Sequence, residues 1–166
     1  MMKQKHGCEF FGQTDYAGLW ANIIASVVTV LGVNAFLFVV NRSRFDDLPP
    51  SRFDLPGWLV GSVWIALFAV LGVARWIVLR TGTEHSRSNA RIIVLLMLFC
   101  LAYPFYTLGL RSLVMGIIGN FLTIGAAGWA AWKIRLTSQI AALLVLSVAA
   151  WVSFANVLIF LSVFSR

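Results

Sequence analysis

Five long runs of uncharged, mostly apolar residues divide the chain. None of them contains an acidic or basic side chain, and they cover residues 16–41, 55–74, 92–110, 112–132 and 136–165. A transmembrane helix needs roughly 20 consecutive apolar residues. No segment shows the period-two alternation of a membrane β-strand. The pattern predicts an all-α membrane protein, a five-helix transmembrane bundle, with helices at about 16–41, 56–80, 91–109, 112–133 and 137–164.

The third and fourth runs are separated only by Arg111. A single helix over residues 92–132 would be about 60 Å long at 1.5 Å per residue, which is twice the roughly 30 Å thickness of the hydrocarbon core. We therefore expect a tight turn at residues 108–112.

The first 15 residues, MMKQKHGCEFFGQTD, form a polar leader. The leader has no apolar centre and no small-residue cleavage site, so it does not resemble a cleavable signal peptide. We expect residues 16–166 to form a single transmembrane domain whose first helix acts as the insertion signal.

Composition supports a multi-pass integral membrane protein, because 60% of the residues are hydrophobic and only 11% are charged. The net charge of +7 comes from Lys and Arg in short loops and at helix ends, where they meet the headgroups of the lipid bilayer rather than nucleic acid. Eight of the 13 basic residues fall on the side of the N-terminus and five on the other. The positive-inside rule then favours a cytoplasmic N-terminus.

The apolar runs lack the side chains that several function classes need. They contain no Asp, Glu, Lys or His, and ion-coupled transporters generally need such a group at depth. Arg75 lies five residues before Arg80, and we expect it to extend to the same interface. Because both histidines lie in loops, we expect no metal centre, no required cofactor and no catalytic residue of a hydrolase.

Seven tryptophans are present, and most lie near helix ends, where they are typical of an interfacial aromatic belt. The belt interpretation covers Trp20, Trp58, Trp76, Trp129 and Trp132. Trp64 and Trp151 lie deeper in their runs. A buried indole N–H needs a hydrogen-bond partner, so these two side chains are candidates for a site inside the bundle.

Small residues gather on two helices. Gly57 and Gly61 form a GxxxG motif, and the fourth run is rich in Gly and Ala. Such faces allow close helix packing, so we expect the fourth helix to lie centrally in the bundle or at the interface of a homodimer.

The stretch SRFDLPGWLVGSVW, residues 51–64, resembles the signature of the tryptophan-rich sensory protein family, also called the translocator protein or peripheral benzodiazepine receptor family. Pro56, Gly61 and Trp64 match that signature without a gap. WVSFANVL, residues 151–158, resembles a second family motif through Trp151, Ala155 and Leu158. Residues 45–48 and 104–106 resemble two further family segments, so the resemblance covers about residues 16–164.

The chain departs from the family pattern at several aromatic and polar positions. Phe53 replaces the first motif tryptophan, and Leu55 replaces the first of two prolines. Ser147 and Val148 replace a Pro-Tyr pair, and Ile159 replaces an asparagine. The resemblance therefore implies a divergent member of the family.

The resemblance implies that the chain binds porphyrin-like or sterol-like apolar molecules in a pocket between the helices, with a tetrapyrrole such as protoporphyrin IX as a possible ligand. The expected ligand-binding residues are Phe53, Pro56, Trp64, Tyr103, Tyr106, Ser147, Trp151 and Ala155. The first loop would cover the pocket as a lid carrying Asp46, Asp47 and Asp54. A solvated connector is the alternative interpretation of this loop.

Two other functions remain open from the sequence. The resemblance also implies a tetrapyrrole-degrading membrane enzyme that uses Trp64 and Trp151. The replaced polar positions instead favour a structural or transport subunit that kept the fold and lost the pocket.

Overall fold

The computed structural model describes residues 15–41, 56–110 and 113–164, and it contains five α-helices and no strand in those ranges. The helices are α1 (Tyr16–Asn41), α2 (Gly57–Arg80), α3 (Ser86–Leu110), α4 (Leu113–Ile134) and α5 (Gln139–Phe164). Each contains a stretch that is long and apolar enough to cross a membrane. The predicted five-helix membrane bundle is therefore confirmed.

The connection between α2 and α3 is short and polar. Gly82 has a φ of +63°, a left-handed conformation that glycine adopts without steric cost. The Ser86 hydroxyl hydrogen-bonds the hydroxyls of Thr81 and Thr83 at the start of α3. The helix thus begins five residues before the expected residue 91, because the charge-free run marks where the chain enters hydrocarbon and the helix extends beyond it.

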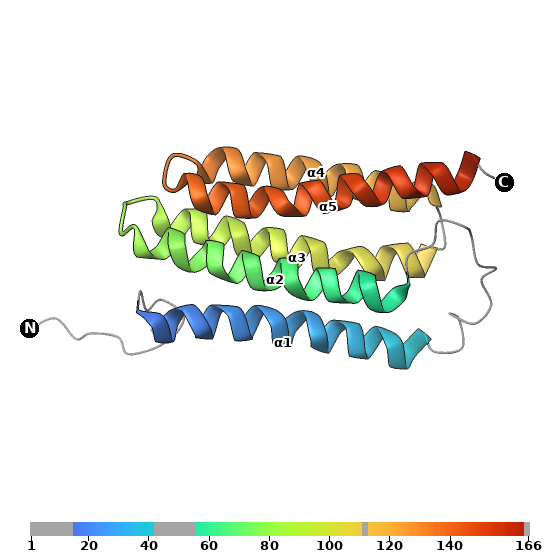
Figure 1. Ribbon diagram of the computed structural model, residues 1–166, viewed down its shortest axis with the longest axis horizontal. Coiled ribbons are helices and arrows are strands. Elements are labelled where there is room, and N and C mark those ends of the chain that lie inside the picture. Colours follow the sequence, from blue (N-terminus) through green and yellow to red (C-terminus); the bar gives the residue numbers. More distant parts are fainter. Residues whose placement is uncertain (1–14, 42–55, 111–112, 165–166) are drawn as a thin grey trace, which may run out of the picture.

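The helices lie side by side in three rows (Figure 1): α1, then α2 with α3, then α4 with α5. The most extensive packing joins α1 to α2 and α4 to α5, and α2 also packs against α3 and α5. In contrast, α1 barely touches α3. The first helix is therefore held to the bundle mainly by α2.

Small side chains form much of the contact between α4 and α5. Ala127, Ala130 and Ala131 of α4 are buried, as are Ala141 and Ala142 of α5. Small residues let two backbones approach closely, which is the main source of helix association in lipid.

Four of the glycines in the predicted packing motifs have open space around them. A Cβ atom added at Gly57, Gly61, Gly125 or Gly128 would meet nothing within 4 Å. These faces are free in the single chain, and the homodimer stays a prediction.

One tryptophan departs from the predicted aromatic belt. Trp20, Trp58, Trp129 and Trp132 are exposed near helix ends, as a belt requires. Trp76 is instead 8% exposed, and its indole N–H donates a 2.9 Å hydrogen bond to the backbone oxygen of Asp15. The belt interpretation of Trp76 was wrong, because this indole finds its polar partner at the start of α1 rather than in the headgroup layer.

Candidate functional site

Several predicted site residues lie outside what the structure describes. Phe53 and the three predicted lid residues, Asp46, Asp47 and Asp54, fall in residues 42–55, and the side chain of Tyr106 is not described either. Pro56 is exposed directly before α2, where its backbone oxygen accepts hydrogen bonds from Leu59 and Val60. For these positions the ligand-binding role stays a prediction.

Trp64 of α2 and Tyr103 of α3 line one small cavity. The cavity has a volume of about 40 Å³, and its walls come from α1, α2 and α3. The other lining residues are Val30, Val33, Asn34, Phe68, Cys100 and Leu101. The Trp64 ring meets the Phe68 ring edge-on, with centroids 6.3 Å apart. The fold thus brings together two predicted site residues that are 39 positions apart in the sequence.

The predicted residues of α5 lie on the other side of α2. Trp151 is half-buried against the hydrophobic core, and its ring centroid is 5.7 Å from that of Phe154. The Ser147 hydroxyl donates a hydrogen bond to the backbone oxygen of Leu144, and Ala155 is half-buried. Trp64 and Trp151 both pack against the same buried core, and a shared ligand cavity between them stays a prediction.

Three polar side chains, Tyr103, Asn120 and Asn156, form a series of hydrogen bonds in the apolar interior. The Tyr103 hydroxyl and Asn120 share a side-chain hydrogen bond, and the Asn120 amide donates a 2.7 Å bond to Asn156 Oδ1. Asn120 is 4% exposed and Asn156 is 5% exposed. The Nδ2 group of Asn156 has no hydrogen-bond partner among the described residues. The sequence identifies both asparagines as polar side chains inside the spans, but their pairing appears only in the fold.

A larger groove runs between α1 and α3, with α2 as its floor. Its volume is about 420 Å³. The lining residues come from all three helices and are Asn22, Ala25, Ser26, Thr29, Phe68, Arg75, Val94, Met97, Leu98 and Leu101. Phe68 and Leu101 also line the Trp64 cavity, so the groove and the cavity adjoin.

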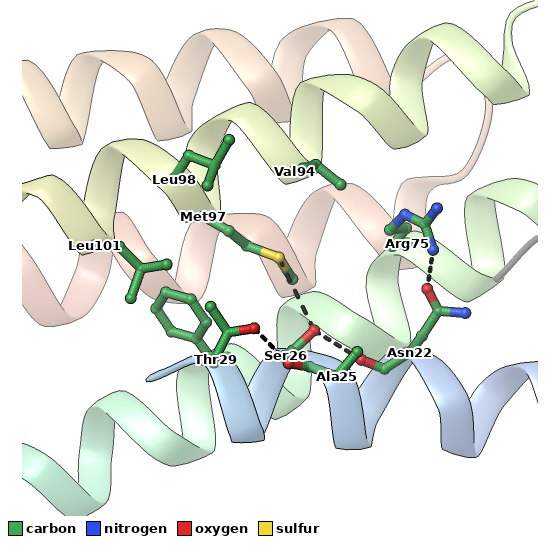
Figure 2. A pocket seen from close by; sticks show the side chains of 10 residues that line it. Asn22, Ala25, Ser26, Thr29, Arg75, Val94, Met97, Leu98 and Leu101 are labelled. Atoms are coloured by element: carbon green, nitrogen blue, oxygen red, sulfur yellow. Dashed lines mark hydrogen bonds between the residues drawn. The ribbon is translucent and has the colours of Figure 1, made fainter. Parts of the chain in front are cut away.

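Arg75 and Asn22 meet at one end of this groove (Figure 2). The Arg75 guanidinium donates a hydrogen bond to Asn22 Oδ1, and the Asn22 amide donates a 2.6 Å bond to the backbone oxygen of Gly18. Asn22 is 2% exposed and Arg75 is half-buried. Extension of Arg75 to the interface stays a prediction, and the structure adds that its guanidinium is bonded to a buried amide on the neighbouring helix.

Gly72 explains why Asn22 can reach Arg75. A Cβ atom at position 72 would lie 2.9 Å from the backbone oxygen of Asn22. Only glycine leaves room for α1 to approach α2 so closely at this level. In the sequence, the signal that could have drawn attention to this contact is the single arginine near the end of an otherwise uncharged run.

Hydroxyl groups continue the polar side of the groove along α1. Ser26 and Thr29 each donate a 2.7 Å hydrogen bond to the backbone oxygen four residues earlier, at Asn22 and Ala25. Figure 2 shows both hydroxyls on the α1 wall, opposite the apolar side chains of α3. The groove is therefore polar along α1 and at Arg75, and apolar along α3.

A second surface groove lies on the α4–α5 hairpin. It has a volume of about 660 Å³ and is lined by Trp132, Arg135 and mostly small or apolar side chains. Lys133 and Arg135 both lie over the Trp132 ring, 5.1 and 5.8 Å from its centroid. Aromatic and basic residues at a helix end are typical of anchoring at the lipid headgroups.

Within the described ranges, no three His, Cys, Asp or Glu side chains lie close enough to hold a metal ion. Cys100 is buried and free, and it lines the Trp64 cavity. The chemistry that the described site offers is therefore apolar contact, aromatic stacking and a few amide, hydroxyl and guanidinium groups.

Comparison with known proteins identifies the fold family. Residues 23–163 match the model of the TspO/MBR family. Searches of the curated proteins and of the solved structures gave no significant match. The family match covers most of α1 and α5 and all of the other three helices, and it includes every residue that lines the Trp64 cavity and every groove residue except Asn22. The chain belongs to the TspO/MBR family.

Proposed function

We propose that this membrane protein binds a flat, apolar molecule of the porphyrin class next to Trp64 and acts as a sensor or receptor for it. The observation that carries the proposal is the convergence of Trp64 and Tyr103, from two helices, on one cavity with mostly apolar walls. Ligand pockets combine such walls with a few polar groups that fix orientation. Here Asn34 and the Tyr103–Asn120 pair supply those groups.

A porphyrin needs more room than the 40 Å³ of this cavity, because pockets for small molecules typically measure about 300–1,000 Å³. The adjoining groove supplies that space, since it shares Phe68 and Leu101 with the cavity. Because α1 makes little contact with α3, these two helices can separate without disrupting the core between α4 and α5. We infer that the ligand enters from the bilayer between α1 and α3.

An absorbance titration of the purified protein with protoporphyrin IX tests the proposal. In darkness, binding should shift and saturate the porphyrin absorption band at a ratio of about one ligand per site. No spectral change at any ratio would contradict ligand binding and would favour a structural or transport subunit.

Illumination of the same samples separates binding from degradation. A sensor should keep the bound porphyrin spectrum under light in the presence of oxygen. Loss of the porphyrin band, faster than in a sample of free porphyrin in the same detergent, would instead indicate the tetrapyrrole-degrading enzyme. Replacing Trp151 with Phe should then slow that loss, if this indole takes part in the reaction.

A further inference from the structure

We propose that the groove on the α4–α5 hairpin binds one anionic phospholipid of the surrounding bilayer, with its phosphate at Arg135 and Lys133 and an acyl chain against the small residues below. This groove shares no lining residue with the Trp64 cavity or with the groove between α1 and α3, so the inference does not depend on porphyrin binding. It rests on two cations placed at one aromatic ring, on the depth of the groove and on the open space at Gly128.

The headgroup end of the groove carries two positive charges at one aromatic ring. Lys133 Nζ and the Arg135 guanidinium carbon lie 5.1 and 5.8 Å from the centroid of Trp132. A cation–π contact places a cation without neutralising it, and Arg135 itself lines the groove. Asp15 and Glu84 are the two acidic residues within the described ranges, and neither lines the groove. Because a guanidinium presents a fork of N–H donors that matches a phosphate, an anionic headgroup fits this end.

The groove descends from these cations to the depth of an acyl chain. Its lining runs from Arg135, directly after α4, back to Gly128, and from Gln139 to Leu146 on α5. Each stretch extends about 10 Å at 1.5 Å per residue, and half of the hydrocarbon core is about 15 Å thick. The groove therefore follows a lipid from its headgroup to well inside one leaflet, whereas a free phosphate ion would occupy only the upper end.

Small residues hollow out the lower part of the groove. Gly128, Ala131 and Ala142 line it beside the exposed side chains of Leu143 and Leu146. A Cβ atom added at Gly128 would meet nothing within 4 Å, so the backbone there is open to an acyl chain. The groove volume of about 660 Å³ lies within the roughly 300–1,000 Å³ of small-molecule pockets.

A second copy of the chain fits this groove less well than a lipid does. Two copies in one membrane have the same orientation, and a two-fold symmetric contact brings the same patch of each together. Lys133 and Arg135 of both copies would then meet at one depth, where like charges repel. Basic clusters at a membrane surface instead attract anionic lipids, which supply the opposite charge.

The test measures lipid binding to the full chain by native mass spectrometry. The protein is purified in an uncharged maltoside detergent and mixed with dioleoyl phosphatidylglycerol or dioleoyl phosphatidylcholine, which differ only in the headgroup. The first phosphatidylglycerol should bind at least tenfold more tightly than phosphatidylcholine, and free glycerol phosphate should not displace it. Equal binding of the two lipids would show ordinary interfacial anchoring, and displacement by glycerol phosphate would show a site for a free anion. Either result would overturn the proposal.

Two arginine variants test the headgroup end of the site. Arg135→Gln should weaken binding of phosphatidylglycerol at least fivefold. Arg87→Gln removes the same charge near the start of α3, where Arg87 is exposed and outside the groove, and it should leave binding unchanged. An equal loss in both variants would show general electrostatic attraction and overturn the assignment to Arg135.

Two glycine variants test the acyl-chain end. Gly128→Leu fills the lower groove and should weaken binding of phosphatidylglycerol at least fivefold. Gly61→Leu adds the same side chain at another open glycine, on α2 and outside the groove, and it should leave binding unchanged. Equal affinities of these two variants would overturn the placement of the chain, and a dimer that Gly128→Leu dissociates would give the groove to a second copy instead. The comparison of the two lipids on the unmodified protein remains decisive even if a variant does not fold.

Discussion

At the scale of single residues, several polar side chains inside this bundle find partners on neighbouring segments of the chain. Arg75 donates to Asn22, Asn120 donates to Asn156, and the Trp76 indole donates to a backbone oxygen at the start of α1. The hydrocarbon core of a bilayer offers no hydrogen-bond partner, so an unsatisfied polar group there is costly. Each of these contacts therefore fixes how two segments of the chain lie against each other.

The proposed ligand site leads to a prediction at Trp64. Trp64→Ala should weaken porphyrin binding by about 1–3 kcal/mol, the scale of a lost stacking aromatic at a binding hot spot. The measurement is the dissociation constant from the absorbance titration in darkness.

Trp58 provides the matched control for this variant. It lies on the same helix and is 73% exposed, so Trp58→Ala should leave binding unchanged. If Trp64→Ala binds porphyrin as tightly as the unmodified protein, Trp64 is not part of the site.

At the scale of helices, the pairs of neighbouring helices differ in how extensively and through which residues they pack. The α4–α5 pair is joined through small buried residues, whereas α1 is held mainly by α2 through the close approach at Gly72. Interactions between membrane helices come from such close packing and from interhelical hydrogen bonds. The α1–α2 and α4–α5 pairs are therefore the units whose stability can be tested separately.

Gly72→Ala should loosen the attachment of α1. The added methyl group would lie 2.9 Å from the backbone oxygen of Asn22, so α1 must move away, at a cost of about 1–3 kcal/mol as in other overpacked cores. The change in the free energy of unfolding can be measured by titration with a denaturing detergent.

Gly61→Ala is the control on the same helix, because a Cβ atom there meets nothing within 4 Å. Its effect should stay within about 0.5 kcal/mol, as for substitutions that touch no special feature. Equal stability of the two variants would contradict the close approach at Gly72.

The hydrogen bond between α4 and α5 can be tested by a double-mutant cycle. Asn120→Leu and Asn156→Leu should each be destabilising, since each leaves a buried amide without its partner, at a cost of about 1–3 kcal/mol. The double variant should recover part of that loss, with a coupling energy of about 0.6 kcal/mol and at most about 1.7 kcal/mol, the average and the maximum measured between membrane helices. Strictly additive effects would show that the two amides do not interact.

At the scale of the whole molecule, five spans place the two ends of the described chain on opposite faces of the membrane. The start of α1, the connection at 81–85 and the connection at 135–138 lie at one end of the bundle, and the end of α5 lies at the other (Figure 1). Basic residues are more numerous on the first side, by eight to five. The positive-inside rule therefore predicts that the start of α1 faces the cytoplasm.

Cysteine labelling in sealed membranes tests this topology. In a Cys8→Ser background, a cysteine introduced at Glu84 or Ser138 should react only after the membrane is made permeable, while one at Arg111 should react with an external reagent at once. Labelling of positions 84 and 111 from the same side would contradict the five-span arrangement. The opposite pattern, with position 84 accessible from outside, would keep the five spans and reverse the orientation.

The sequence alone determined the number and approximate position of the helices. Bilayer thickness sets the length of an apolar span, so the charge-free runs were sufficient to predict five helices and the break between α3 and α4. Only the start of α3 differed by more than two residues, since Ser86–Arg91 is helical and polar. The sequence also suggested Trp64 and Tyr103 as ligand-binding residues; both line the small cavity, and their role in ligand binding stays a prediction.

Only the tertiary structure decided which faces of the helices meet. A membrane helix is apolar both toward lipid and toward its neighbours, so its hydrophobic pattern does not show which side faces inward. The contacts of Trp76 with the start of α1 and of Asn120 with Asn156 follow from the rotation and pairing of helices. The groove at Arg75 has the same origin, because Gly72 brings α1 onto α2 at one level while α1 and α3 stay apart.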